Sequence, residues 1–212
     1  MPKPSSQRQE RKAALRDAID QKKKRTALIW RGVLVVIAIG VAIFAYRYYA
    51  TRRALETVIT ASYRAGMHVA GPITYKEDPP IGGAHNVVWQ NCGIYDIAIH
   101  NEHAVHSMEH GAVWITYRTD LPRDQVQMLR SVAADDFMLL SPYPGLKAPV
   151  VASAWNHQIA LDGADDPRLR PFIAEYKNNP QTTPEFGAPC AGGTSANAMA
   201  DTLTTPPRDM TR

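Results

Sequence analysis

The stretch Ile99-His-Asn-Glu-His-Ala-Val-His-Ser-Met-Glu-His-Gly-Ala-Val-Trp-Ile-Thr-Tyr117 contains four of the seven histidines of the chain. Its last part, from Ala112 to Tyr117, is rich in β-branched and aromatic residues and predicts a strand. The first part is polar, and its backbone conformation decides which side chains can meet. We expect one or two polar turns that lead into the strand.

Imidazole and carboxylate groups are concentrated in this stretch, and both are common ligands of divalent transition metals. If the polar part is helical, His103, His106 and His110 share one stripe, which suits zinc. Gly111 would then end the helix. If it is extended, His106, Met108 and His110 share one face, and imidazole with thioether suits copper. The alternative without metal is a solvated loop, or a hydrogen-bonded brace that orients the start of the strand.

Length and charge limit the classes of protein to consider. A chain of 212 residues is long enough for one folded domain with appendages. The net charge is +4, and ten of the 24 lysines and arginines precede Gly32. The remainder is close to neutral, so no nucleic-acid partner is indicated. We read residues 1–26 as a basic cytoplasmic arm.

An apolar segment at 27–49 follows the arm. Its core, Ala27–Tyr46, has the length of about 20 residues that is needed to cross ~30 Å of hydrocarbon. The basic residues lie mainly on its N-terminal side, which places the arm in the cytoplasm and the rest of the chain outside. A cleaved signal peptide is the competing interpretation, but no clean cleavage site follows Phe44. The sequence predicts an uncleaved single-pass anchor in the cell membrane, with membrane lipid as its partner; it does not identify a protein partner.

The two cysteines would then lie in an oxidising compartment, where an even count is typical of a disulfide. A bridge from Cys92 to Cys190 would close a loop of ~100 residues and stabilise the fold by up to ~4.7 kcal/mol in the chain-entropy model. The alternative is two buried free thiols. Pairing would also remove soft sulfur from the candidate metal site.

Residues 51–190 are expected to form one compact two-layer α+β domain outside the cytoplasm. Arg52–Ala65 is read as a continuation of the membrane helix that stops at Gly66, and Met67–Tyr75 as a short strand. The strand at Ala112 is followed by a helix, two strand-like segments, a pairing strand and a helix: 121–134, 137–140, 149–155, 157–161 and 166–176. The tail at 191–212 holds small and polar residues and is predicted to be disordered.

A resemblance supports part of this interpretation. The residues that carry it are Tyr75, Pro79-Pro80, Gly83, His85, Trp89, Gly93, Tyr95 and the run from Val105 to Val113. Over about residues 68–176 the chain resembles the bacterial family known as domain of unknown function 3105, in which single-pass anchored members are typical. Matched residue by residue, the pattern singles out His85, His106, Glu109 and His110, and leaves out His100 and His103. Relatives more often have Leu at the position of Met108, which weakens a role in copper binding.

Three functions follow from these residues. The first is a membrane-anchored extracytoplasmic protein that binds copper or zinc through His85, His106, Glu109 and His110. Met108 and His103 are further candidate ligands. The second is a non-catalytic structural or partner-binding module in which the cluster is the brace.

The third function is hydrolysis. The string His106-x-x-Glu109-His110 matches inverted zinc proteases, in which the glutamate activates a metal-bound water. That motif belongs on a long helix, whereas Gly111 and a strand follow here at once. We therefore assign no catalytic residue and leave open whether the chain is an enzyme.

Overall fold

The computed structural model of the chain describes residues 4–199, so the expectations for residues 1–3 and 200–212 lie outside the described residues. The chain divides into two units, residues 1–50 and residues 51–212. Each unit is described by itself.

One helix, α1 (Pro4–Ala54), contains both the basic arm and the apolar segment. Its part from Gln21 to Ala54 is long and apolar enough to cross a membrane, by length and composition. Large apolar side chains are exposed along it, for example Ile37 and Phe44. A helix that is apolar all round needs either a protein core or lipid around it.

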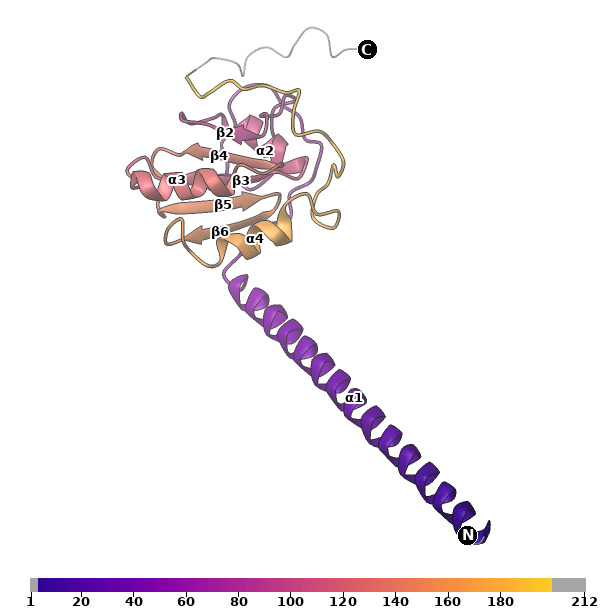
Figure 1. Cartoon of the computed structure of the whole chain (residues 1–212). Helices are drawn as coiled ribbons and strands as arrows, with labels where there is room; N and C mark the ends of the chain where they lie inside the picture. Colours follow the sequence, from indigo (N-terminus) through magenta and orange to yellow (C-terminus); the bar gives the residue numbers. More distant parts are fainter. Residues whose placement is uncertain (1–3, 200–212) are drawn as a thin grey trace. The chain divides into compact units, whose positions relative to one another are not determined.

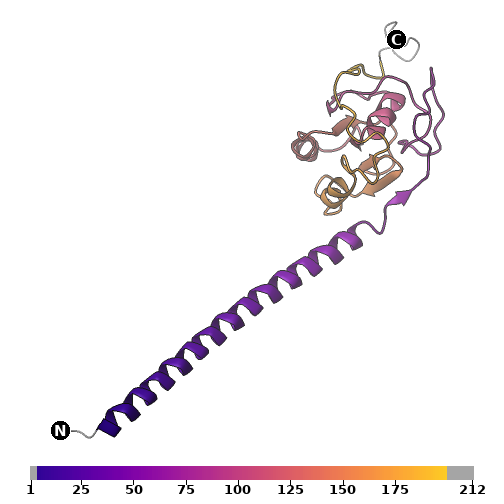
Figure 2. The same ribbon diagram turned by 90° about the vertical axis from the view of Figure 1, so that its right-hand side faces the viewer.

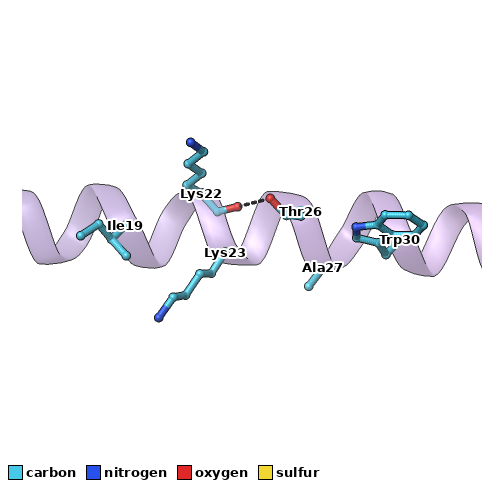
Figure 3. Close-up of a pocket in the computed structure, with 6 residues that line it drawn as sticks. All are labelled: Ile19, Lys22, Lys23, Thr26, Ala27 and Trp30. Carbon is cyan, nitrogen blue, oxygen red and sulfur yellow. Dashed lines mark hydrogen bonds between the residues drawn. The ribbon is translucent and has the colours of Figure 1, made fainter.

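Figure 3 shows the part of α1 that contains two lysines of the basic arm and Ala27 and Trp30 of the apolar segment. Lys22 and Lys23 project from the helix before the apolar run, and Trp30 lies further along. The hydroxyl group of Thr26 donates a hydrogen bond to the Lys22 carbonyl oxygen at 2.9 Å. Thr26 thus satisfies its polar group within the helix itself.

The unit from Thr51 onward is built around a six-stranded mixed sheet with the strand order β1-β6-β5-β3-β4-β2 (Figure 1). The strands are β1 (Ile59–Thr60), β2 (Gly93–Ile94), β3 (Val113–Tyr117), β4 (Met138–Pro142), β5 (Val150–Ala154) and β6 (His157–Leu161). The helices are α2 (Asn101–Glu109), α3 (Arg123–Val132) and α4 (Leu169–Tyr176). β3 pairs in parallel with β4, through the crossover that contains α3, and antiparallel with β5.

The central strands β3 and β5 are buried on both faces of the sheet, which explains why β3 has no charged residue. Val113, Ile115 and Tyr117 point to one face and pack with the residues of α3 and α4. Trp114 points to the other face and packs with α2. Figure 2 shows the same division, with α3 and α4 on one side of the sheet and α2 with the preceding segment on the other. The predicted α+β class is confirmed.

The segment after α1 corrects two expectations. The helix ends at Ala54, not at Ala65, because the β-branched run Thr57–Thr60 favours an extended chain and β1 pairs antiparallel with β6. Met67–Tyr75 forms no named strand; it contributes one isolated bridge, between His68 and His85. Pro72 follows Gly71 there, and proline has no N–H to continue a ladder.

The first residues of the tail correct a third expectation. Residues 191–199 are tied to the domain by backbone hydrogen bonds, from Thr194 to the Trp89 carbonyl at 2.8 Å and from Ala198 to the Ala98 carbonyl at 2.7 Å. Gly193 allows this contact, because a Cβ atom there would lie 2.2 Å from the Trp89 oxygen. Backbone pairing orders this segment although it has few large apolar side chains.

Candidate metal centre

The polar part of the opening stretch is a helix that is buried almost throughout. In α2 every residue from Glu102 to Glu109 is buried. In place of the expected one or two polar turns, the structure has a buried helix of nine residues. The surrounding loops supply hydrogen-bond partners for its polar side chains. The helix stops as predicted before Gly111, which has φ +105°. A Cβ atom at Gly111 would lie 3.0 Å from the Cα of Asn178, so only glycine fits without displacing a neighbour.

Each buried histidine around α2 uses its Nδ1 atom in a hydrogen bond to a backbone carbonyl. The pairs are His85 with Gly83 at 2.8 Å, His103 with Val88 at 2.5 Å, His106 with Asn86 at 2.8 Å, and His110 with Pro189 at 2.8 Å. A carbonyl only accepts, so the hydrogen-bond network assigns the proton to Nδ1. The lone pair of Nε2 is left on the opposite side of each ring, and this is how proteins commonly orient metal-ligating histidines.

Four side chains converge at the first group of ligand atoms, which we call the inner set: His68, His85, His106 and Glu109. One ligand atom from each lies within 4.8 Å of all the others. The backbone bridge between His68 and His85 brings the two loop residues together, and α2 supplies the other two. His68 is exposed, whereas the other three are buried.

The contact between His85 and Glu109 is the most informative part of the inner set. The His85 Nε2 atom lies 2.9 Å from the Glu109 Oε2 atom, and both side chains are completely buried. Oε1 of Glu109 accepts a hydrogen bond from the Gly66 N–H at 2.6 Å. With the proton of His85 on Nδ1, the Nε2 atom of His85 and the Oε2 atom of Glu109 are both hydrogen-bond acceptors and face each other. Only a positively charged species, a proton or a metal ion, relieves this repulsion.

The electrostatics of α2 keep its ligand groups in the form that binds metal. Burial, together with the neighbouring His110 and His85 rings, lowers the pKa of His106 to about 3. Burial alone would raise the pKa of Glu109, but a hydrogen bond from His85, with a proton on Nε2, and the one from the Gly66 N–H outweigh it, so this pKa lies below its ordinary value. Neutral imidazole and ionised carboxylate are the states that coordinate metals.

A second group of ligand atoms, the outer set, consists of His106, His110 and Glu185. The Nε2 atom of His110 lies 3.2 Å from Oε2 of Glu185, whose side chain is 40% exposed. The backbone N–H of Glu185 donates to the Glu109 carbonyl oxygen at 3.2 Å and so fixes the C-terminal segment against α2. The ring of Trp89 packs on His110, with centroids 4.9 Å apart.

The structure places the other sequence candidates away from both sets. His103 belongs to neither set of ligand atoms. Met108 is completely buried in the apolar cluster with Trp114 and Leu139. The extended geometry that would have aligned Met108 with two histidines is wrong, because a helical turn points it to the sheet. Cys92 and Cys190 lie at disulfide distance, with Cα atoms 5.4 Å apart.

Sequence reasoning brought forward His85, His106, Glu109 and His110, but it missed two side chains. His68 lies in the segment that we expected to be a strand, and no motif in the sequence marks it as a ligand. Glu185 lies between prolines in a segment without periodicity, and no sequence signal marks it. The role of Gly66 as a donor to Glu109 was also missed, because a glycine after a helical pattern looks like a helix stop.

Residues 68–192 match the family described as protein of unknown function (DUF3105). The match covers more than half of the chain, so the chain belongs to this family. It includes every buried residue of the inner set as well as Glu185 and both cysteines. No curated protein and no solved structure matches the chain.

Proposed function

We propose that the domain binds one divalent transition-metal ion through the inner set. The observation that carries this proposal is the convergence of His68, His85, His106 and Glu109 within 4.8 Å, with two acceptor atoms opposed at 2.9 Å in a buried place. A metal ion at this point would turn the repulsion between His85 and Glu109 into two coordinate bonds. Three imidazoles and one carboxylate complete a tetrahedral zinc site.

The chemistry of the donors narrows the choice of ion. Met108 is enclosed in the apolar core, and the two cysteine side chains face each other. Soft sulfur ligands are thereby removed from the inner set, and these are the ligands that favour Cu⁺. Nitrogen and oxygen donors favour a divalent ion, either Zn²⁺ or Cu²⁺.

Binding is a better account than hydrolysis. Catalytic zinc sites keep one coordination position for water, whereas the inner set offers four protein ligands. In an inverted zinc protease the glutamate of the motif must be free to take a proton from water. Glu109 instead has one oxygen bonded to the Gly66 N–H and the other against His85.

A hydrogen-bonded brace is the second candidate, and the four ring-to-carbonyl bonds favour it. These bonds tie α2 and His85 to the loops around them. His103 has only this role, since it belongs to neither ligand set. The brace accounts for the Nδ1 atoms but not for the convergence of four ligand-type side chains in the inner set, so we place it second.

We also propose that α1 is a single membrane anchor with the basic arm in the cytoplasm and the domain outside. The apolar length of Gln21–Ala54 and its exposed side chains support the anchor. The cluster from Lys22 to Arg25 supports the orientation, because basic residues stay on the cytoplasmic side. A signal sequence is the competing interpretation of the same helix.

Zinc titration of the full chain in detergent micelles, against a competing chromophoric chelator, tests the binding proposal. We expect one zinc ion per chain. Glu109→Gln and His85→Gln keep the side-chain volume and remove a ligand, so each should weaken binding on the order of 100-fold or more. His100→Gln and Glu175→Gln, outside both sets, should bind as the wild type does.

Circular dichroism of the same samples checks that the variants are folded. Equal affinity of the wild type and the two ligand variants would contradict the inner set as the site. The absence of zinc binding by the wild type would leave the brace as the better account.

A further inference from the structure

We propose that the ion binds first to the outer set when it enters and last to the outer set when it leaves the inner set. During the transfer between the two sets it stays coordinated to Nε2 of His106. This inference rests on the metal binding proposed above and adds a route to it. The geometry points to a route because His106 is the one residue that both sets share.

His106 can serve only one ion at a time. Its Nδ1 atom donates to the Asn86 carbonyl, so a single lone pair, on Nε2, remains for coordination. The two sets are therefore alternative positions of one ion and not a site for two. The rings of His85 and His110 both lie next to the His106 ring, with centroids 4.8 Å and 4.6 Å away from its centroid.

The outer set is suited to exchange with solvent. It has three protein ligands, which leaves a coordination position for water, and such positions are where ligands enter and leave a metal. Glu185 is partly exposed and carries a negative charge that attracts a cation from solution. The inner set has four ligands, of which three are buried, so it is suited to retention.

Transfer is a ligand exchange without a change of oxidation state. The ion first binds His106, His110 and Glu185. It then forms bonds to His85 Nε2, Glu109 Oε2 and His68, while those to His110, Glu185 and the bound water break. The water returns to solvent, and the bond to His106 persists throughout. Each set contains one carboxylate, so the ion meets the same ligand charge before and after the move. The transfer thus avoids the desolvation of an uncompensated charge.

A direct route past His68 competes with this one, because His68 is also exposed. The two routes differ in what Glu185 does. On the direct route, Glu185 is irrelevant. On the proposed route, Glu185 speeds both uptake and release but does not contribute to the final affinity.

The test is stopped-flow mixing of the full chain in detergent micelles with zinc alone, and of the zinc-loaded chain with excess chelator. Glu185→Gln should slow zinc uptake by about tenfold, since electrostatic attraction changes on-rates by at least this factor. Zinc release should slow by the same factor, because the affinity is the ratio of the two rates and the final ligands are the same. The equilibrium affinity of this variant should stay within about twofold of wild type, because the final ligands are unchanged. Glu175→Gln, another exposed glutamate of this unit, is the matched control and should leave both rates unchanged.

Each other outcome overturns a stated part. Wild-type rates in Glu185→Gln, with zinc still bound, overturn the route and leave the inner site standing. A loss of affinity in Glu185→Gln as large as that in Glu109→Gln makes Glu185 a permanent ligand and also overturns the route. Binding of two zinc ions per chain would contradict the inference that the two sets are alternative positions of one ion. No zinc binding by the wild type overturns the proposed function, and the route with it.

Discussion

A histidine side chain in this domain has two separable roles, one for each ring nitrogen. Nδ1 of His85, His106 and His110 fixes the ring to a carbonyl, which leaves Nε2 as the atom available to the ligand sets. Replacement by alanine would remove both roles at once and confuse a loss of metal with a loss of packing. Glutamine keeps a hydrogen-bonding group and much of the volume, which is why the tests above use it.

Asp166 provides a residue-scale test that is independent of metal. Its carboxylate accepts hydrogen bonds from the backbone N–H groups of Asp162 and Arg168, and from the Arg168 guanidinium at 2.6 Å. The Arg168 side chain is the main reason that the pKa of Asp166 falls to about 2, against the opposing effect of burial. These bonds hold the turn that begins α4.

The sign of the pH dependence follows from this shift. The pKa in the folded state lies below the value of 3.8 expected without these contacts, so the ionised carboxylate stabilises the fold above that pH. At neutral pH, Asp166→Asn should lower the free energy of unfolding by about 1–2 kcal/mol, allowing for solvent screening at the partly exposed Arg168.

Urea denaturation at a series of pH values measures the effect. The advantage of the wild type over Asp166→Asn should shrink as the pH falls from 3.8 toward 2. Asp165→Asn, the exposed neighbour, should show no such change and serves as the control. A difference between wild type and Asp166→Asn that stays constant down to pH 2 would contradict this account.

At the residue scale, the predictable part of the site is the part encoded locally. His106 and Glu109 are three positions apart, so a helical turn brings them to one side whatever surrounds the helix. His68 and Glu185 come from irregular segments, and their positions depend on loops that pair with distant residues. Such pairing leaves no periodic trace in the sequence.

At the scale of elements, the second half of the domain could be predicted because its hydrophobic periodicity is strong. The structure has strands and helices at 113–117, 123–132, 138–142, 150–154, 157–161 and 169–176, close to the predicted ranges. In α3 the side chains of Val126, Leu129 and Val132 pack against the core. An amphipathic pattern fixes an element and its buried face together.

The elements that could not be predicted are those whose tertiary contacts override local preference. The helical pattern of residues 52–65 yields to a two-residue strand, because β6 offers an edge for pairing. Residues 63–100 contain little regular structure, and α2 is buried because these loops cover it. A sequence of polar residues such as that of α2 looks solvated until its partners are known.

At the scale of the whole molecule, the position of the domain relative to the membrane is open to a direct test. Glu175→Cys places a thiol on the exposed side of α4, and Gln21→Cys places one in the basic arm. In intact cells a membrane-impermeant maleimide should label Glu175→Cys and not Gln21→Cys. Labelling of the arm alone would reverse the orientation, and loss of the arm from the mature chain would show a cleaved signal sequence.

X-ray absorption at the zinc edge, on the zinc-loaded full chain, tests the central claim most directly, because it reports the atoms bound to the ion. The inner set predicts a shell of about four nitrogen and oxygen atoms at ~2.0–2.1 Å, with the outer scattering of imidazole rings. This shell should lose one imidazole in His85→Gln. A six-oxygen shell typical of hydrated zinc, or sulfur at ~2.3 Å, would contradict the site proposed for this domain.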